Sequence, residues 1–291
     1  MAVTPLRPTT LSSNSVSIPF DDTYFAPLPD SAALLDDPAA LRARLAEEGV
    51  LYLRGLLDPD AVRRLRAAYF ALFPPGYLKP GTSAYEGVLG DASVPLPPYG
   101  VTGHPAHTFV RTTEFERFVD QPALRTLAEK VLDAPVTRLA RVILRHFDNL
   151  SGKSSRAHVD HTYMDRGTER VVTMWLPVGD SRLEHGGLVY LQGSHRLTPA
   201  ELEPLRSVTD RPGDTRPLSH DLGWVADQLH RRWLWADYAA GDLALHGPRV
   251  VHAGLDNTVE TMRVSVDVRF AASVERPDDR WLRPWSADDG A

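Results

Sequence analysis

Cysteine is absent from this chain of 291 residues. The protein therefore has no disulfide, no thiolate nucleophile, and no cysteine-ligated zinc or iron–sulfur site. Any metal that it binds must be held by histidine and carboxylate side chains. The chain offers 11 histidines and 38 acidic residues for that purpose.

Excess basic charge and long apolar runs are also missing. The formal net charge is −6, whereas nucleic-acid binding usually needs a concentrated basic face. No stretch reaches the roughly 18 consecutive apolar residues of a membrane span. The opening residues, MAVTPLRPTT, lack the apolar segment of a secretory signal. We therefore expect a cytoplasmic protein whose partners include neither nucleic acid nor membrane.

Local patterns divide the chain into an arm, a helical entry and a β-rich remainder. Residues 1–20 are rich in Ser, Thr and Pro without periodicity, which predicts a flexible N-terminal arm. Residues 21–291 are then expected to form a single domain. Within it, residues 38–133 show apolar side chains at helical spacing. Residues 136–275 carry successive β-branched and aromatic runs, typical of an all-β barrel or sandwich rather than a doubly wound parallel sheet.

Two connections are longer than the usual 2–6 residues. Residues 76–112 are rich in Gly, Pro, Tyr and His, and residues 196–232 separate two predicted strands. Long loops at the mouth of a barrel often form binding walls and lids, so we expect a lid at 196–232. His104 and His107 in the first connection are candidates for substrate contact, with an ordinary surface loop as the alternative.

The last predicted strand has two chemically different faces. Val264, Val266, Val268 and Phe270 alternate with polar residues, which are Arg263, Ser265, Asp267 and Arg269. The apolar face belongs against other elements. The polar face has two possible environments: solvent outside a sheet, or the interior of a barrel with a wet, functional lumen.

A histidine and an aspartate two positions apart project from the same side of an extended chain and can share a metal ion. The sequence has two such pairs, His146–Asp148 and His158–Asp160, and a short motif of this kind also arises by chance. The second pair is favoured by its context. It precedes a hydrophobic strand, and His252 follows later with Arg263 eleven residues beyond it. Two imidazoles and one carboxylate form the facial triad of non-haem Fe(II) oxygenases, which leaves coordination positions open.

These features resemble the phytanoyl-CoA dioxygenase-like family of Fe(II)/2-oxoglutarate oxygenases, over residues 38–275. The matching segments are EEGVLYLRGLLDPDAVRRLRAAY, SGKSSRAHVDHTY, GGLVYLQGSHRL and HAGLDNTVETMRVSVDVRF. The resemblance implies a mainly β fold with flanking helices, built on a double-stranded β-helix, which is a jelly-roll or cupin-like barrel.

The same resemblance implies a role for individual residues. His158, Asp160 and His252 would bind Fe(II), and Arg263 would pair with the distal carboxylate of 2-oxoglutarate. Trp175 lies where relatives place an aromatic side chain beside the cosubstrate. No side chain is expected to act as a general acid or base, because the chemistry is centred on the metal.

The implied activity is a dioxygenase reaction that consumes O₂ and decarboxylates 2-oxoglutarate to succinate. Hydroxylation of a small molecule, in a bacterial pathway for an antibiotic or another secondary metabolite, is the expected outcome. Epimerisation, ring closure and desaturation are the alternatives on the same scaffold. Asp160 argues against halogenation, because related halogenases carry a small residue there. Tyr163, just after the metal turn, is a third candidate for substrate contact, and a homodimer is a plausible assembly.

Two other classes of protein share some of these features. A zinc metallohydrolase would use His-x-His-x-Asp-His, but Arg156 stands at the first position of that motif. A β-barrel binding protein without catalysis would share the fold, although here the three ligands and Arg263 are all retained. We assign no metal or substrate role to His161, His195, Trp233 and Trp235.

Overall fold

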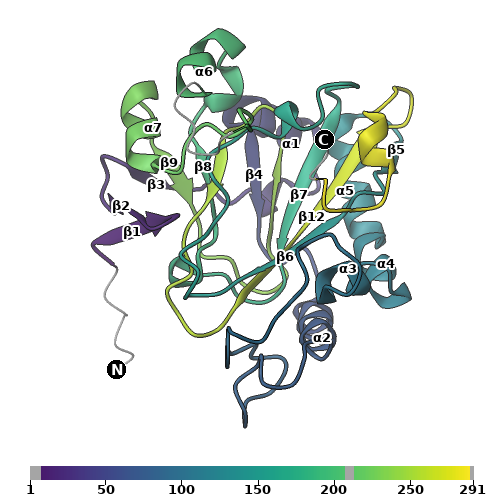
Figure 1. The fold of residues 1–291 in the computed structure, drawn as a ribbon. Coiled ribbons are helices and arrows are strands. Elements are labelled where there is room, and N and C mark those ends of the chain that lie inside the picture. Colours follow the sequence, from purple (N-terminus) through teal and green to yellow (C-terminus); the bar gives the residue numbers. More distant parts are fainter. Residues whose placement is uncertain (1–7, 207–212, 289–291) are drawn as a thin grey trace.

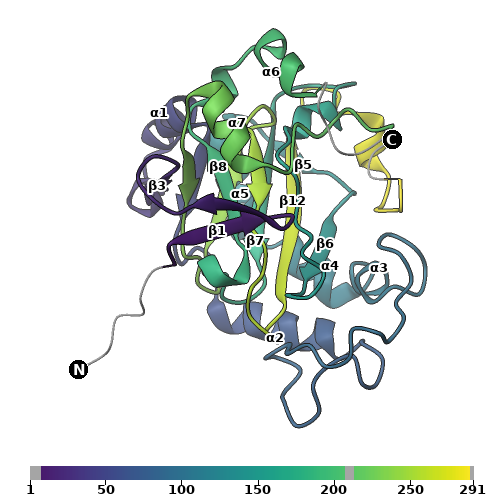
Figure 2. The same ribbon diagram turned by 60° about the vertical axis from the view of Figure 1, so that its left-hand side comes forward.

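The computed structural model describes residues 8–206 and 213–288, and these residues form two main β-sheets (Figures 1 and 2). The larger sheet has the strand order β4-β10-β7-β12-β5, with β6 also paired to β12. Its strands are β4 (Val50–Leu53), β5 (Val136–Arg138), β6 (Ile143–Phe147), β7 (Val171–Pro177), β10 (Leu243–His246) and β12 (Arg263–Ala272). The smaller sheet has the order β11-β8-β9-β3. Its strands are β3 (Phe25–Pro27), β8 (Leu188–Leu191), β9 (Trp233–Trp235) and β11 (His252–Gly254).

Helices cover the outer face of the larger sheet, as Figure 1 shows. They are α1 (Pro38–Glu48), α2 (Pro59–Phe70), α3 (Pro105–Phe109), α4 (Thr113–Val119) and α5 (Pro122–Leu132). Asp37 caps α1 through the Ala40 amide, with proline in its first turn. Gly49 ends α1 at φ 77°, a left-handed conformation that glycine adopts without strain.

The strand β12 separates the helical layer from the space between the sheets. Its valines and Phe270 belong to the core beneath the helices. Its polar face points the other way and lines a cavity, with Arg263 only 2% and Arg269 only 4% exposed. Of the two environments considered for this face, the interior is therefore the one observed. A strand whose apolar side is covered by helices must turn its other side toward the facing sheet.

The N-terminal arm predicted for residues 1–20 is wrong from Thr10 onward. The chain there forms a hairpin of β1 (Thr10–Ser13) and β2 (Val16–Pro19), while residues 1–7 lie outside the described part. The turn residues Asn14 and Ser15 have positive φ angles, and their amides donate to the Asp256 carboxylate at 2.8 Å. The hairpin thus depends on a partner far along the chain, which no local pattern reveals.

The connection 196–232 contains α6 (Pro199–Arg206) and α7 (Leu222–Leu229), and its residues 207–212 lie outside the described part. The helix α7 packs against β2. Between the helices, Leu218 is buried and Pro217 reaches the wall of the central cavity. Among the described residues, no helix is long and apolar enough to cross a membrane.

Candidate metal centre

Local backbone geometry brings the His158–Asp160 pair next to His252. The amides and carbonyls of His158 and His252 pair as an antiparallel bridge, with both N–H···O distances 3.0 Å. Val159 is extended, at φ −115° and ψ 137°, so its two neighbours project to the same side. A 3₁₀ helix, Asp160–Thr162, then turns the chain away.

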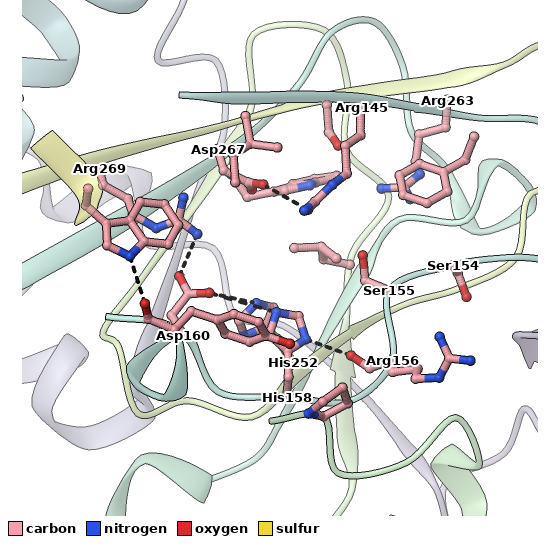
Figure 3. A pocket seen from close by; sticks show the side chains of 18 residues that line it. Arg145, Ser154, Ser155, Arg156, His158, Asp160, His252, Arg263, Asp267 and Arg269 are labelled. Carbon is pink, nitrogen blue, oxygen red and sulfur yellow. Dashed lines mark hydrogen bonds and ion pairs between the residues drawn. The ribbon is translucent and has the colours of Figure 1, made fainter. Parts of the chain in front are cut away.

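The three side chains converge on one point. Their candidate ligand atoms lie within 4.8 Å of one another. Asp160 Oδ1 is 3.8 Å from the Nε2 atoms of both His158 and His252, and the two imidazole centroids are 4.3 Å apart (Figure 3). In the described part of the chain no other His, Asp or Glu group forms such a cluster.

Hydrogen bonds direct the correct nitrogen of each histidine to the centre. His158 Nδ1–H donates to the Arg156 carbonyl at 2.7 Å, and His252 Nδ1–H donates to the Val250 carbonyl at 3.0 Å. Because a carbonyl only accepts, each Nε2 keeps its lone pair for a metal. Burial lowers the pKa of both imidazoles, most strongly that of His252. Both rings are therefore neutral at pH 7, as metal ligation requires.

Asp160 presents one oxygen to the centre and is held by the other. Its Oδ2 atom accepts from Thr173 Oγ1 at 2.6 Å and from Arg269 Nη2 at 3.0 Å. Burial by itself would raise the pKa of Asp160, but the adjacent Arg269 guanidinium holds the pKa well below its ordinary value. The side chain is therefore a carboxylate whose Oδ1 atom is available as a ligand.

The three residues border a cavity of about 180 Å³ between the two sheets. The wall combines apolar side chains with an ion pair between Arg145 and Asp267, whose closest atoms are 3.7 Å apart. The other residues that line it are Ile143, Phe147, Ser154, Ser155, Arg156, Tyr163, Trp175, Leu188, Pro217, Arg263, Ser265, Arg269 and Trp281. The site is thus a partly open cavity with space beside the triad.

Arg263 is the cavity residue best suited to a carboxylate. Its Nε and Nη2 atoms are buried and have no hydrogen-bond partner among the described residues. The guanidinium lies over the Phe147 ring, 4.1 Å from its centroid. Burial lowers the pKa of Arg263 to about 10, so the group remains charged at pH 7. A buried cation with free N–H groups calls for an anionic ligand.

Of the other residues predicted to contact cosubstrate or substrate, two line the cavity and two do not. Trp175 and Tyr163 line it, with Tyr163 edge-on to His158 at 5.7 Å between centroids. His104 and His107 do not line it. His104 is buried and caps α3 through the Ala106 amide, while His107 belongs to α3 itself.

The rejected pair His146–Asp148 also lies apart from the triad. His146 projects from β6 toward the helices, where the hydroxyls of Tyr69 and Tyr99 each lie 2.8 Å from its Nδ1 atom. Its Nε2 atom lies 3.3 Å from the Tyr77 hydroxyl. Asp148 instead caps its own loop through the amides two and three residues on.

Sequence reasoning missed the residues that surround Asp160. They are Thr173, His246 and Arg269, together with Trp281, which packs on Arg269. The alternation of β12 placed Arg269 on the same face as Arg263, and that signal could have marked it. The positions of His246, on a short buried strand, and of Trp281, near the end of the chain, carry no such local signal.

Comparisons with known proteins agree with this geometry. The family model described as Phytanoyl-CoA dioxygenase (PhyH) matches residues 45–265. The chain belongs to the PhyH family. Members use Fe(II) and 2-oxoglutarate, and these are the cofactors of this enzyme. The residues fit both groups: a triad with free Nε2 and Oδ1 atoms for the metal, and the unpartnered Arg263 for a carboxylate.

Individual relatives of this PhyH protein are distant but cover its length. The chain is 24% identical to the 1-deoxypentalenic acid 11-beta-hydroxylase of Streptomyces exfoliatus, over 88% of this chain and 89% of the relative. It is 26% identical to the Streptomyces arenae enzyme of that name, over 90% of each chain.

Solved structures confirm the predicted fold class. The epimerase SnoN from nogalamycin biosynthesis, solved with Fe³⁺ and α-ketoglutarate, superposes with a TM-score of 0.58 at 19% identity, covering 82% of this chain and 86% of SnoN. The carbocyclase SnoK has a TM-score of 0.58 at 18% identity, covering 91% and 92%. The two sheets of this PhyH protein therefore form the double-stranded β-helix of Fe(II)/2-oxoglutarate enzymes.

Proposed function

We propose that His158, Asp160 and His252 hold Fe(II), that Arg263 binds the distal carboxylate of 2-oxoglutarate, and that the enzyme hydroxylates a small molecule of secondary metabolism. The observation that carries this proposal is the convergence of two Nε2 atoms and one carboxylate oxygen within 4.8 Å. The two histidines are oriented by carbonyls and Asp160 by Thr173 and Arg269, so hydrogen bonds within the protein hold all three side chains.

When bound, iron and 2-oxoglutarate supply an oxidation by O₂ that is coupled to the release of succinate and CO₂. The protein contributes orientation and the exclusion of water. Arg263 anchors one end of the cosubstrate through a charge-assisted pair. We propose that Trp175 packs beside the cosubstrate and that Tyr163 contacts the substrate. No side chain in this scheme transfers a proton.

The relatives support a role in modifying a small molecule of secondary metabolism. Their names include several types of reaction. The curated relatives are named as hydroxylases, whereas SnoN is an epimerase and SnoK a carbocyclase. We propose hydroxylation as the principal outcome, with epimerisation, ring closure or desaturation as alternatives. The connection 196–232 contributes Pro217 to the cavity wall, which supports its assignment as a lid that selects the substrate.

Spectroscopy of the anaerobic protein tests the metal site. Fe(II) with 2-oxoglutarate should give a weak visible charge-transfer band in the parent protein. Asp160→Ala should abolish that band, because one of three ligands is lost. The matched control is Asp148→Ala, from the other His-x-Asp pair, which should keep it. A band that persists in Asp160→Ala would refute the ligand assignment.

The mass of the product distinguishes the possible types of reaction. We propose 1-deoxypentalenic acid as the first probe, followed by related small molecules. Turnover is measured as succinate formed with O₂ and 2-oxoglutarate. Hydroxylation adds one oxygen atom to the probe, desaturation or oxidative ring closure removes two hydrogens, and epimerisation leaves the mass unchanged. The homodimer and the cytoplasmic location stay predictions, which sedimentation of the purified chain and cell fractionation would check.

A further inference from the structure

Asp160 is held by an arginine that the metal-site motif does not include. Arg269 lies six residues beyond Arg263 on the same face of β12, at the opposite side of the triad in Figure 3. Its Nη2 atom is 3.0 Å from Asp160 Oδ2, and both side chains are 5% exposed. With Thr173 Oγ1 on the same oxygen, two donors occupy Oδ2 and leave Oδ1 facing the histidines.

A tryptophan from the C-terminal segment fixes Arg269 in this position. Trp281 lies in the 3₁₀ helix Asp279–Leu282 and is 3% exposed. The Arg269 guanidinium lies 4.2 Å from the centroid of the Trp281 ring. The indole N–H donates to the Tyr163 carbonyl at 3.0 Å, in the turn that carries Asp160. Asp160, Arg269 and Trp281 therefore form a continuous series of contacts.

The rest of the C-terminal segment is attached to the same loop. The Arg166 amide donates to Asp278 at 3.1 Å, and Arg280 pairs with Asp165 at 2.7 Å. The Thr168 amide donates to the Arg276 carbonyl at 2.9 Å. The segment thus binds the chain directly after Asp160 at several points. Arg269 and Trp281 both lie outside the residues 45–265 that match the family model.

We propose that Arg269 is a positioning residue for the iron ligand Asp160, and that the C-terminal segment 276–288 completes the metal centre by holding Arg269 through Trp281. This inference rests on the proposed function, because it takes Asp160 to be an iron ligand. Two donors on Oδ2 restrict the carboxylate to binding through one oxygen, which keeps neighbouring coordination positions open. Without Arg269, the buried Asp160 carboxylate would lose the arginine that pairs with it among the described residues, and its Oδ2 atom would be held less firmly.

The first experiment measures Fe(II) affinity by anaerobic titration in the presence of 2-oxoglutarate, following the visible band. Arg269→Gln should weaken Fe(II) binding by about 10- to 100-fold, the usual effect of removing a partner of a metal ligand. Arg269→Lys, which keeps the charge, should recover part of that affinity. The control is Arg66→Gln. Arg66 is also a buried arginine, but it donates to backbone carbonyls away from the triad, so its loss should lower Tm and leave Fe(II) affinity unchanged.

A double-variant cycle tests the part played by the C-terminal segment. Trp281→Ala should weaken Fe(II) binding in the same direction, and adding it to Arg269→Gln should cause no further loss, because Trp281 acts through Arg269. Trp285→Phe is the control, since Trp285 is a buried tryptophan of the same segment that packs near Tyr99 instead. Losses that simply add in the double variant would overturn the assignment of Trp281.

A folded Arg269→Gln protein that binds Fe(II) as tightly as the parent would overturn the proposal. Should that variant not fold, Arg269→Lys decides the question: Fe(II) affinity equal to that of the parent contradicts the proposal, and a loss supports it, because an ammonium does not reproduce the guanidinium geometry at Oδ2. Failure of this inference is distinct from failure of the proposed function. The band would then still depend on Asp160 but not on Arg269, whereas independence from both would refute the metal site itself.

Discussion

Arg263 borders the cavity, and its guanidinium lies between an aromatic ring and the backbone at Gly254. Phe147 covers one face of the group, and a side chain at Gly254 would come within 3.7 Å of its Nη2 atom. Its buried N–H groups have no partner in the part of the chain that the structure describes. An unpaired buried cation is costly, so the position is prepared for an anion. Only a planar group with several donors in a fixed array suits both the stacking and the pairing.

Removal of this guanidinium should act on the cosubstrate rather than on the metal. Arg263→Gln should weaken 2-oxoglutarate binding by ~1.5–3 kcal/mol, the range for a hydrogen bond to a charged group. That loss corresponds to about a 10- to 100-fold higher KM for 2-oxoglutarate. Anaerobic titration of the visible band with 2-oxoglutarate measures it, and Arg263→Lys should restore part of the affinity. An unchanged affinity in Arg263→Gln would assign the distal carboxylate to another residue.

At the scale of elements, the β1–β2 hairpin is held in place by one buried carboxylate. Asp256 accepts from the amides of Asn14 and Ser15 and from Ser154 Oγ, and it is 7% exposed. Ser13, in the same hairpin, donates to the Gly254 carbonyl. The hairpin thereby connects to the loop after β11, which carries His252, and to the segment that leads into His158.

Loss of this carboxylate should release the hairpin. Asp256→Ala leaves two amides and a hydroxyl without their acceptor, and each lost bond of this kind costs about 1–3 kcal/mol when the partner stays buried. Hydrogen exchange should show reduced protection of residues 10–19, together with a lower Tm. Asp37→Ala offers a comparison, because it removes only an exposed helix cap worth about 1 kcal/mol. Equal exchange rates for residues 10–19 in the parent and Asp256→Ala would contradict this role.

At the scale of the whole molecule, a cluster around His146 joins the connection 76–112 to the larger sheet. Tyr77 and Tyr99 come from that connection and Tyr69 from α2, and all three hydroxyls reach the His146 ring. His104 stacks on the same ring with an interplanar angle of 13°. The neighbours of His146 on β6, Arg145 and Phe147, line the cavity on the opposite side of the strand. The connection therefore supports the cavity wall from behind and does not enter it.

Acid should unfold the protein partly through this cluster. Burial lowers the pKa of His146 from 6.5 to about 3. Below pH 6.5 the unfolded chain therefore binds a proton at this imidazole that the folded chain does not bind. The free energy of unfolding is unaffected above pH 6.5 and falls as the pH drops below that value. At pH 5 this single group accounts for a loss on the order of 2 kcal/mol. Urea unfolding at pH 7.5 and pH 5 measures the difference, and His146→Gln should reduce it. If the free energy of unfolding changes between the two pH values as much in His146→Gln as in the parent, other titrating groups cause the change.

The sequence alone determined the parts of this protein that depend on short-range order. Residue spacing set His158 and Asp160 on one side of the chain, and the alternation along β12 divided it into an apolar and a polar face. The starts of α1 and α2 are equally local, because in each helix a proline and a capping aspartate act within one turn. His252 and Arg263 were chosen from their order after the His158–Asp160 pair and from the resemblance to a family, because no local interaction marks them.

The tertiary structure decided everything that depends on which distant segments meet. It ordered residues 10–19 as a hairpin through Asp256, and it directed the polar face of β12 inward. It also placed His104 outside the cavity wall and packed Trp281 against Arg269. The hairpin requires a contact between residues 242 positions apart, and the other outcomes require separate elements to pack or one face to be buried by another layer. Local propensities do not encode such contacts, because their free energy appears only when the sheets and helices pack together.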